Sequence, residues 1–214
     1  PRSTLDRSSA ASECIRDRVI EVHSLVNEAS QTTLAYRDLV LATGAHSRLL
    51  PNLAVNNQTI FAVNHLDEYK SFQQRLNTLK SQKSAPVKVA IIGAGLIGCE
   101  FANDLIGQNT GNQTADITVA VFDKAARPLS QQLPSEAGIM LQDALTQSGV
   151  TFYLGTDITS ITTNIDTSDN ATVTISFDKD KQSQTFEADI VLIAIGLVAN
   201  TEPVSYTHLR AHET

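Results

Sequence analysis

The stretch Val87–Leu105, VKVAIIGAGLIGCEFANDL, decides the fold of this chain. Its first part, Val87–Ile92, is a short apolar run that ends in a glycine, which is typical of a buried parallel strand. Gly93, Gly95 and Gly98 then form the pattern G-x-G-x-x-G, and apolar residues continue beyond it at helical spacing. Strand, glycine turn and helix are the physical parts of a dinucleotide-binding site.

Each glycine has a separate physical role in such a site. Gly93 permits the tight turn, Gly95 has no side chain to keep a pyrophosphate away from the backbone, and Gly98 lets the helix pack closely against its strand. The helix N-terminus offers unpaired N–H groups and the positive end of a dipole to the phosphates. We therefore expect the whole turn to bind the cofactor: Gly93, Ala94, Gly95, Leu96, Ile97 and Gly98.

An acidic residue follows the next predicted strand, Ile117–Phe122. Asp123 stands at its C-terminal end, where a carboxylate accepts hydrogen bonds from ribose hydroxyls. The loop Gly107–Asp116 accounts for its longer than usual distance from the glycines. The alternative is an ordinary βαβ unit with a solvated carboxylate, but the complete context favours a nucleotide. Asp123 would repel a 2′-phosphate, so we predict NADH over NADPH, with Lys124 and Arg127 as counter-evidence.

Composition narrows the function further. The 214 residues can form one large or two small domains, and 42% hydrophobic content is ample for a core. The net charge of −7 and the absence of a basic run argue against nucleic acid as a partner. The sequence has neither an apolar run of membrane-spanning length nor a signal-peptide pattern, so we expect a cytoplasmic protein. Cys14 and Cys99 are too few for a zinc site, and we expect no metal.

The chain before the glycine motif contains a mixture of elements. Val19–Val26 and Thr32–Tyr36 alternate well enough for a β-hairpin, and Leu39–Ala42 reads as a strand that runs into a glycine. Leu66–Leu79 has apolar residues at helical spacing. Lys80–Pro86 is polar and ends in proline, so we place a domain boundary there.

The chain after Asp123 continues the α/β pattern. Ser135 is expected to cap a helix, and Asp178–Gln184 reads as a turn within a β-meander. Further strands are expected at Val150–Leu154, Asp157–Thr163, Ala171–Phe177 and Ile190–Ile195. The predicted fold class is α/β: a Rossmann-like domain with a parallel sheet, into which the meander is inserted as a crossover.

These motifs resemble those of the FAD-dependent pyridine nucleotide (disulfide) oxidoreductases, flavoproteins with two dinucleotide-binding domains. The resemblance covers roughly residues 18–199 and is specific in GAGLIGCEFANDL at Gly93–Leu105. Together with ATGA at Ala42–Ala45, VNHLDEY at Val63–Tyr69 and AIGL at Ala194–Leu197, it resembles the rubredoxin–NAD(+) reductase branch.

The resemblance implies a domain organisation. Residues 14–84 would be the C-terminal part of a split FAD-binding domain, and residues 85–199 the NAD-binding domain. Residues 1–13 read as a disordered or non-native end, and residues 200–214 as a tail resembling translated cloning adapter. The first glycine motif of the family and its late Gly-Asp motif are not found, so we expect a fragment truncated at both ends.

The resemblance also implies a reaction, in which NADH reduces FAD and electrons pass to rubredoxin or a similar small electron-transfer protein. Glu100, placed in the first helical turn, would position the reacting rings, although an anion there is also favoured by the helix dipole alone. Thr43, Gly44 and Arg48 would lie near the FAD, and Gly196 is a further expected cofactor-binding residue. We expect this chain alone to hold no FAD and to be inactive.

Two other functions stay open on the sequence. One is a stand-alone NAD-binding module without redox catalysis. The other is a different branch of the same fold, such as an NADH oxidase or a ferredoxin reductase.

Overall fold

A computed structural model of the chain describes residues 18–23, 31–51, 53, 55, 58–109, 116–165 and 171–201. The chain divides into two compact units. The larger unit is Ser47–Leu197, and the other contains the described residues of Pro1–His46 and Val198–Thr214. The glycine motif belongs to the larger unit.

A five-stranded parallel sheet forms the centre of the larger unit. Its strands lie in the order β4 (Ile60–Ala62), β11 (Ile190–Ile193), β5 (Val87–Ile92), β6 (Ile117–Asp123) and β7 (Val150–Leu154). Every neighbouring pair is parallel, and Ile91 of β5 lies opposite Val121 of β6. Continuous apolar runs suit these strands because both faces of the sheet are covered.

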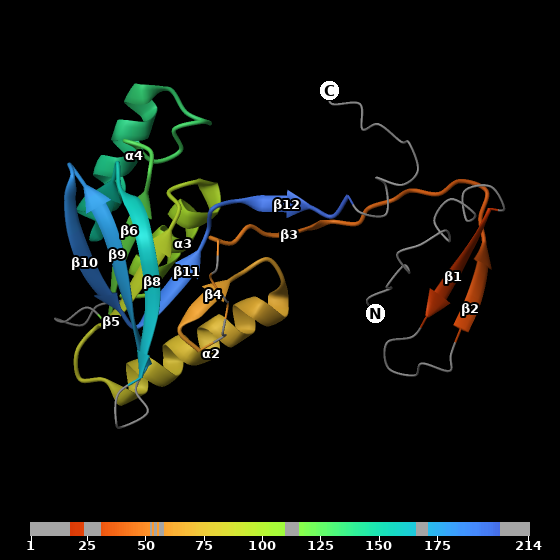
Figure 1. Cartoon of the computed structure of the whole chain (residues 1–214), viewed down its shortest axis with the longest axis horizontal. Helices are drawn as coiled ribbons and strands as arrows, with labels where there is room; N and C mark the ends of the chain where they lie inside the picture. The colour runs from red at the N-terminus through yellow and green to blue at the C-terminus, as the bar shows by residue number, and fades with distance from the viewer. Residues whose placement is uncertain are drawn as a thin grey trace. The chain divides into compact units, whose positions relative to one another are not determined.

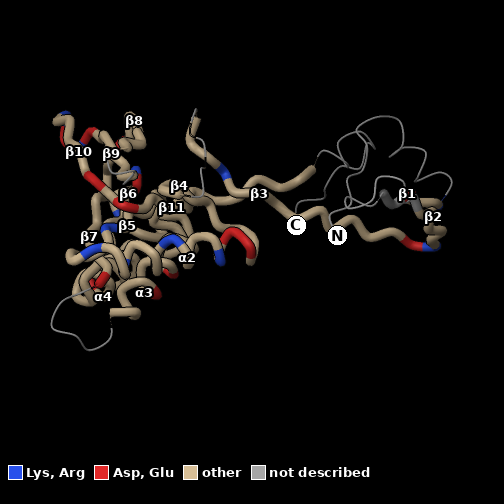
Figure 2. The backbone as a smooth tube through the Cα atoms, turned by 90° about the horizontal axis from the view of Figure 1, so that it is seen from below, with Lys and Arg blue, Asp and Glu red and all other residues tan. Residues whose placement is uncertain are grey.

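Three helices pack on one face of this sheet. They are α2 (Leu66–Gln82), α3 (Leu96–Gly107) and α4 (Ser135–Gln147). Figure 2 shows them on one side of the sheet, with β8, β9 and β10 on the other. The buried stripe of α3 consists of Gly98, Cys99, Ala102 and Leu105. Its spacing is that of a helix with one apolar face.

The opposite face of the sheet carries a three-stranded antiparallel meander (Figure 1). Its strands are β8 (Asp157–Ile165), β9 (Ala171–Lys179) and β10 (Gln182–Ala188). Alternate residues of β9 are fully buried, and the ring of Phe177 meets that of Phe122 in β6 with centroids 5.2 Å apart. Helices, parallel sheet and meander therefore make three layers, which confirms the predicted α/β class.

The smaller unit contains an antiparallel hairpin of β1 (Val19–His23) and β2 (Gln31–Ala35). The hairpin was predicted, although its loop lies outside the described residues. The strand expected at Leu39–Ala42 is wrong, because these residues form no ladder and Val40 is 86% exposed. The next strand is β3 (Ala45–Ser47), which pairs with β12 (Leu197–Ala199).

Three local expectations differ from the structure. The turn expected at Asp178–Gln184 is shorter, because β10 begins at Gln182. The strand expected to reach Ile195 ends at Ile193. Ser135 is the first residue of α4 rather than its cap, which is Pro134 and provides no side-chain hydrogen bond.

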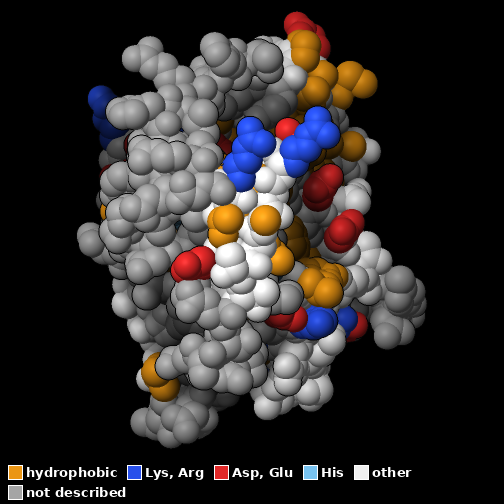
Figure 3. All heavy atoms as spheres, turned by 90° about the vertical axis from the view of Figure 1, so that its right-hand side faces the viewer, with side chains coloured by type: hydrophobic (Ala, Val, Ile, Leu, Met, Phe, Trp, Pro, Cys, Tyr) orange, Lys and Arg blue, Asp and Glu red, His pale blue; other side chains and the backbone are white. Residues whose placement is uncertain are grey.

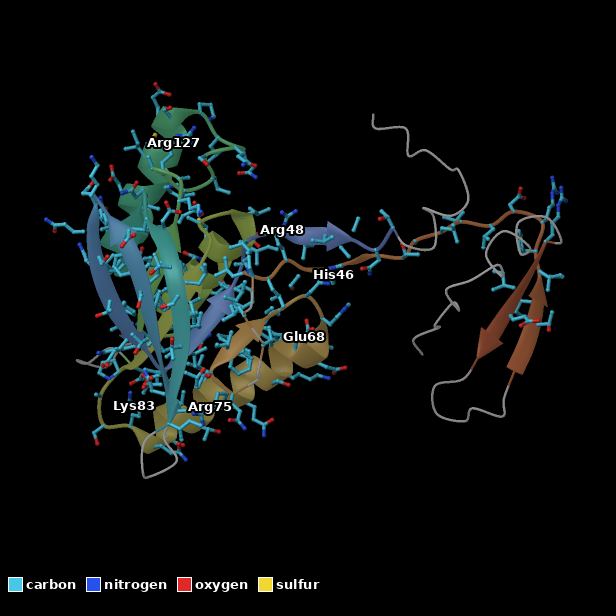
Figure 4. The ribbon with its side chains drawn as sticks, in the orientation of Figure 1. His46, Arg48, Glu68, Arg75, Lys83 and Arg127 are labelled. Carbon is cyan, nitrogen blue, oxygen red and sulfur yellow. The ribbon has the colours of Figure 1, made fainter. Side chains whose placement is uncertain are left out.

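The larger compact unit begins at Ser47 and includes residues 80–86, where the sequence predicts a domain boundary. It also includes β4, which the sequence did not reveal and which pairs with β11 in the central sheet. The segment after α2 is also tied to this sheet. Lys83, labelled in Figure 4, donates from Nζ to both carboxylate oxygens of the buried Asp189 at 2.7 Å. The Lys88 N–H donates to the same carboxylate at 2.8 Å.

None of the helices in the described part of the chain combines the length and apolar character needed to span a bilayer. Figure 3 shows acidic, basic and hydrophobic side chains interspersed on one face. Among the described residues drawn there, no continuous basic surface is present.

Candidate functional site

The glycine turn between β5 and α3 has a shape that only glycine allows at two of its three positions. Gly93 has φ +111°, and a Cβ there would overlap the backbone of Ala194, which follows β11. A Cβ at Gly98 would overlap the carbonyl oxygen of Gly93. Both glycines therefore fix how closely the helix and the next strand approach the turn.

Gly95 differs from these two, because a Cβ built on it meets no atom within 4 Å. Gly95 is the N-cap of α3 in an extended conformation with φ −77°, which any residue adopts. Packing of the protein therefore does not explain a glycine here. Open space above the backbone at a helix N-terminus is what the approach of a phosphate group requires.

The N-terminus of α3 is left available for an anion. It has no side-chain cap and no acidic residue in its first turn. At α2, by contrast, the Glu68 carboxylate accepts from the Asn64 and His65 N–H groups at 2.7 and 3.0 Å. A negative side chain thus already satisfies the start of α2, whereas no carboxylate among the described residues caps the first N–H groups of α3.

Asp123 lies at the C-terminal end of β6, as the sequence predicts, and its carboxylate contacts the turn. Its Oδ2 accepts from the Ala94 N–H at 2.6 Å, and its Oδ1 accepts from the Ala125 N–H at 2.7 Å. A carboxylate has room for further hydrogen bonds beyond these two. The contacts fix its orientation before any ligand arrives.

The loop after β6 holds the turn from the other side. The Leu129 N–H donates to the Ala94 carbonyl at 2.9 Å, and Leu129 has φ +48°, which is uncommon for a branched side chain. Arg127 supports this loop: its Nη2 donates to the Ser130 carbonyl at 3.0 Å, and its Nη1 is buried without a partner among the described residues. A Cβ on Gly138 would lie 3.0 Å from that Nη1, so the guanidinium packs against α4 (Figure 4).

Cys99 is buried behind the turn, where its thiol donates to the Ala94 carbonyl at 3.5 Å. Burial, with a smaller contribution from the Asp123 charge, raises the pKa of the Cys99 thiol to about 11. A thiol with so high a pKa is protonated at neutral pH and is a poor nucleophile. It acts as a packing residue, as expected.

Glu100 is exposed and is the fifth residue of α3, so it lies beyond the first turn in which the sequence placed it. The helix begins earlier than expected because Leu96, directly after Gly95, is already helical. The favourable dipole interaction is correspondingly weaker at Glu100, since it falls off within the first turn.

The remaining predicted residues make backbone or side-chain hydrogen bonds within the chain. Arg48 is exposed, and its N–H donates to the carbonyl of Gly196, which has φ +101°, at 2.9 Å. Thr43 and Gly44 are in the smaller unit. There the Thr43 hydroxyl already donates to the Asn200 carbonyl at 2.6 Å, and the Asn200 N–H donates to the Gly44 carbonyl at 2.9 Å.

Asn200 is a residue that the sequence reasoning missed. Its side-chain Nδ2 donates to the Thr43 carbonyl at 3.0 Å, so its Oδ1 is the atom that faces His46. His46 Nδ1 lies 2.7 Å from this oxygen and therefore donates to it. The only signal in the sequence was the position of Asn200 shortly after the AIGL segment.

Comparison with known proteins identifies the family of the chain. The family model for pyridine nucleotide-disulphide oxidoreductase matches residues 7–212. The chain is 39% identical over 184 residues to rubredoxin-NAD(+) reductase of Acinetobacter baylyi, covering 85% of this chain and 42% of that protein. It is 33% identical to a nitric oxide reductase FlRd-NAD(+) reductase of Aeromonas salmonicida, covering 79% and 38%.

Solved structures give the same fold. A ferredoxin reductase from Rhodopseudomonas palustris matches with a TM-score of 0.68 and 25% identity, covering 96% of this chain and 43% of that one. A water-forming NADH oxidase from Lactobacillus brevis, bound to NADH, matches with a TM-score of 0.69 and 21% identity, covering 89% and 37%. The chain spans about two fifths of the length of the curated relatives it matches.

Proposed function

This chain belongs to the pyridine nucleotide-disulphide oxidoreductase family, and we propose that it binds NADH at the glycine turn as part of a flavin-dependent reductase. The observation that carries the proposal is the N-terminus of α3. It has no side-chain cap, no acid in its first turn and open space over Gly95. These features fit a pyrophosphate, because its charge and oxygens complement the helix dipole and the free N–H groups.

The ribose next to the adenine would lie against Asp123. Its carboxylate is already oriented by the Ala94 and Ala125 N–H groups, so little entropy is lost when a ribose hydroxyl donates to it. The same negative charge would repel a 2′-phosphate. This arrangement supports NADH as the preferred nucleotide.

The proposed reaction is reduction of FAD by NADH followed by single-electron transfer to an acceptor, and the bound cofactors would supply the hydride and electron chemistry. Within that scheme, Glu100 is the proposed positioning residue for the reacting rings, because its side chain is exposed two residues beyond the last glycine of the turn. Thr43, Gly44 and Arg48 are proposed to lie near the FAD. The Thr43 side chain would contribute little there, since its hydroxyl already donates within the chain.

The proposed electron acceptor is rubredoxin or a similarly small redox protein, in the cytoplasm. The support is the 39% identity with rubredoxin-NAD(+) reductase of Acinetobacter baylyi. A ferredoxin reductase or NADH oxidase branch is the second candidate, supported by the structural likeness to a ferredoxin reductase at 25% identity. A stand-alone NAD-binding module would use the same turn without any flavin.

Nucleotide binding to the chain tests the proposal directly. NADH absorbs and emits at longer wavelengths than protein side chains, so its binding can be followed by its own fluorescence. We expect saturable NADH binding to the whole chain, weaker NADPH binding, and no stoichiometric FAD binding. Absence of NADH binding by a folded chain would refute the proposal. Stoichiometric FAD binding with NADH oxidation would contradict the expectation that this chain is inactive alone.

A further inference from the structure

Two oppositely charged side chains pair beyond the end of β6, next in the chain to Asp123. Asp123 ends the strand, Lys124 follows it, and Asp157 begins β8. Lys124 Nζ lies 2.6 Å from the Asp157 Oδ1, with side-chain exposures of 79% and 67%. Asp157 is therefore the acid that engages the cation beside the proposed ribose site.

Backbone hydrogen bonds hold Asp157 in this place. The turn between β7 and β8 donates to the loop after β6 and to the end of the strand itself. The Gly155 N–H donates to the Ala125 carbonyl at 2.9 Å, and the Thr156 N–H donates to the Asp123 carbonyl at 3.0 Å. Thr156 is buried with 2% exposure. The nearness of Asp157 to Lys124 thus follows from the fold and not only from the reach of the long Lys124 side chain.

Lys124 is the cation best placed to bind a 2′-phosphate. Enzymes that use NADPH accommodate this group with a basic side chain close to the strand end at which NAD enzymes carry an acid. Arg127 is unsuited to that role, because its Nη2 donates to the Ser130 carbonyl and its Nη1 is buried. Access of a 2′-phosphate to a basic group therefore depends on Lys124, and Lys124 is paired.

We propose that Asp157 is a specificity-determining residue that disfavours NADPH by engaging Lys124. The inference rests on the proposed NADH site and adds a second acid to its selectivity. With Asp157 in place, the three side chains carry a net charge of −1 next to the ribose. Replacing Asp157 with asparagine brings that sum to zero and releases the Lys124 ammonium to meet the phosphate.

The expected gain is modest because the pair is exposed and screened by solvent. We expect Asp157→Asn to tighten NADPH binding by about two- to fivefold at low ionic strength, the range expected for an exposed ion pair. NADH has no 2′-phosphate, so its dissociation constant should hardly change. Salt should reduce the gain, since exposed charges are screened.

The experiment measures the dissociation constants of NADH and NADPH for the whole chain and three variants. These are Asp157→Asn, the double variant Asp157→Asn with Lys124→Ala, and Glu187→Gln as a matched control. Glu187 is an exposed acid two residues before Asp189, near the opposite end of the parallel strands from Asp123. The Glu187→Gln substitution removes one negative charge, as Asp157→Asn does, but at a position remote from the proposed ribose site. Circular dichroism confirms that each variant is folded.

The proposal expects tighter NADPH binding only in the single Asp157→Asn variant, and loss of that gain in the double variant. Equal gains in Asp157→Asn and Glu187→Gln would overturn it, because net charge alone would explain them. So would NADPH binding that is unchanged in Asp157→Asn while NADH still binds the parent chain. Failure of the folded parent chain to bind either nucleotide would instead overturn the proposed function, and this inference with it.

Discussion

Replacing Gly95 with alanine should separate cofactor binding from folding. The Gly95 Cβ position is open, whereas a Cβ at Gly93 or Gly98 would overlap backbone atoms. Alanine also adopts the observed φ of −77° without strain. The substitution therefore adds one methyl group to the surface that a pyrophosphate would approach and leaves the protein packing unchanged.

Two opposing effects keep the expected change in stability small. Alanine is a poorer N-cap than glycine by about 0.5–1 kcal/mol. The loss of glycine also restricts the unfolded chain, which stabilises the fold by about 0.4–1 kcal/mol. The net change in the free energy of unfolding should stay within about 0.5 kcal/mol. In a chain of this size, that corresponds to a shift in Tm of about 2 °C or less.

The expected change in binding is much larger. The methyl group would displace a phosphate oxygen from the N–H groups of the α3 N-terminus. Loss of one charge-assisted hydrogen bond costs about 1.5–3 kcal/mol. That cost corresponds to NADH binding weakened by about ten- to 150-fold.

The assay combines NADH titration with thermal unfolding of the same samples. Gly107→Ala is the matched control, because a Cβ at Gly107 also meets no atom within 4 Å. It lies at the other end of α3, about 18 Å from the turn at 1.5 Å per residue. We expect Gly107→Ala to bind NADH like the parent chain. A folded Gly95→Ala variant with unchanged NADH affinity would refute the assignment of the turn to the pyrophosphate.

Asp123→Ala should weaken NADH binding more than NADPH binding, so the ratio of the two dissociation constants, measured by titration with each nucleotide, should move toward one. An unchanged ratio would argue against a contact between Asp123 and the ribose. Asp189→Asn should lower the free energy of unfolding in urea by about 2 kcal/mol, because it disrupts a buried carboxylate held by Lys83. Asp67→Asn, which removes an exposed pair, should cost less than about 0.5 kcal/mol. The Cys99 pKa is raised to about 11 in the fold, so the thiol of the unfolded chain ionises first as pH rises. The free energy of unfolding should therefore fall between about pH 9 and 11, and Cys99→Ala should remove the part of that fall due to this thiol.

The parallel strands were predictable because their apolar runs reflect burial on both faces. The expected ranges for β5 and β7 agree with the structure to the residue. Burial of β5 is nearly continuous, with Lys88 as the exposed exception. The composition of such strands reflects their burial on both faces, so they can be predicted from local sequence alone.

The elements that were missed owe their conformation to neighbours. β4 has three residues, and its extended state depends on pairing with β11. β10 is an edge strand of the meander in which only Phe186 and Ala188 are shielded from solvent. Its polar residues read as a turn because its ladder with β9, not its composition, makes it a strand.

The site was predictable in its residue types but not in its contacts. The glycine pattern and the acid at the end of β6 indicate a nucleotide because each has a local physical reason. The pairing of Lys124 with Asp157 joins residues 33 positions apart, and it arises only when β7 brings the two loops together. Sequence reasoning placed Lys124 among the possible phosphate ligands because its partner was not visible.

The contact between Asp123 and Ala94 links the two halves of the proposed site. The carboxylate that would bind the ribose also fixes the N–H of the residue between the first two glycines. The Ala94 carbonyl in turn accepts from the Leu129 N–H, so the turn is held on both sides of one residue by the end of β6 and its following loop. A change at Asp123 therefore alters the phosphate subsite as well as the ribose subsite. Selectivity for the ribose and affinity for the pyrophosphate should consequently be coupled and not additive, as expected for residues that share a partner.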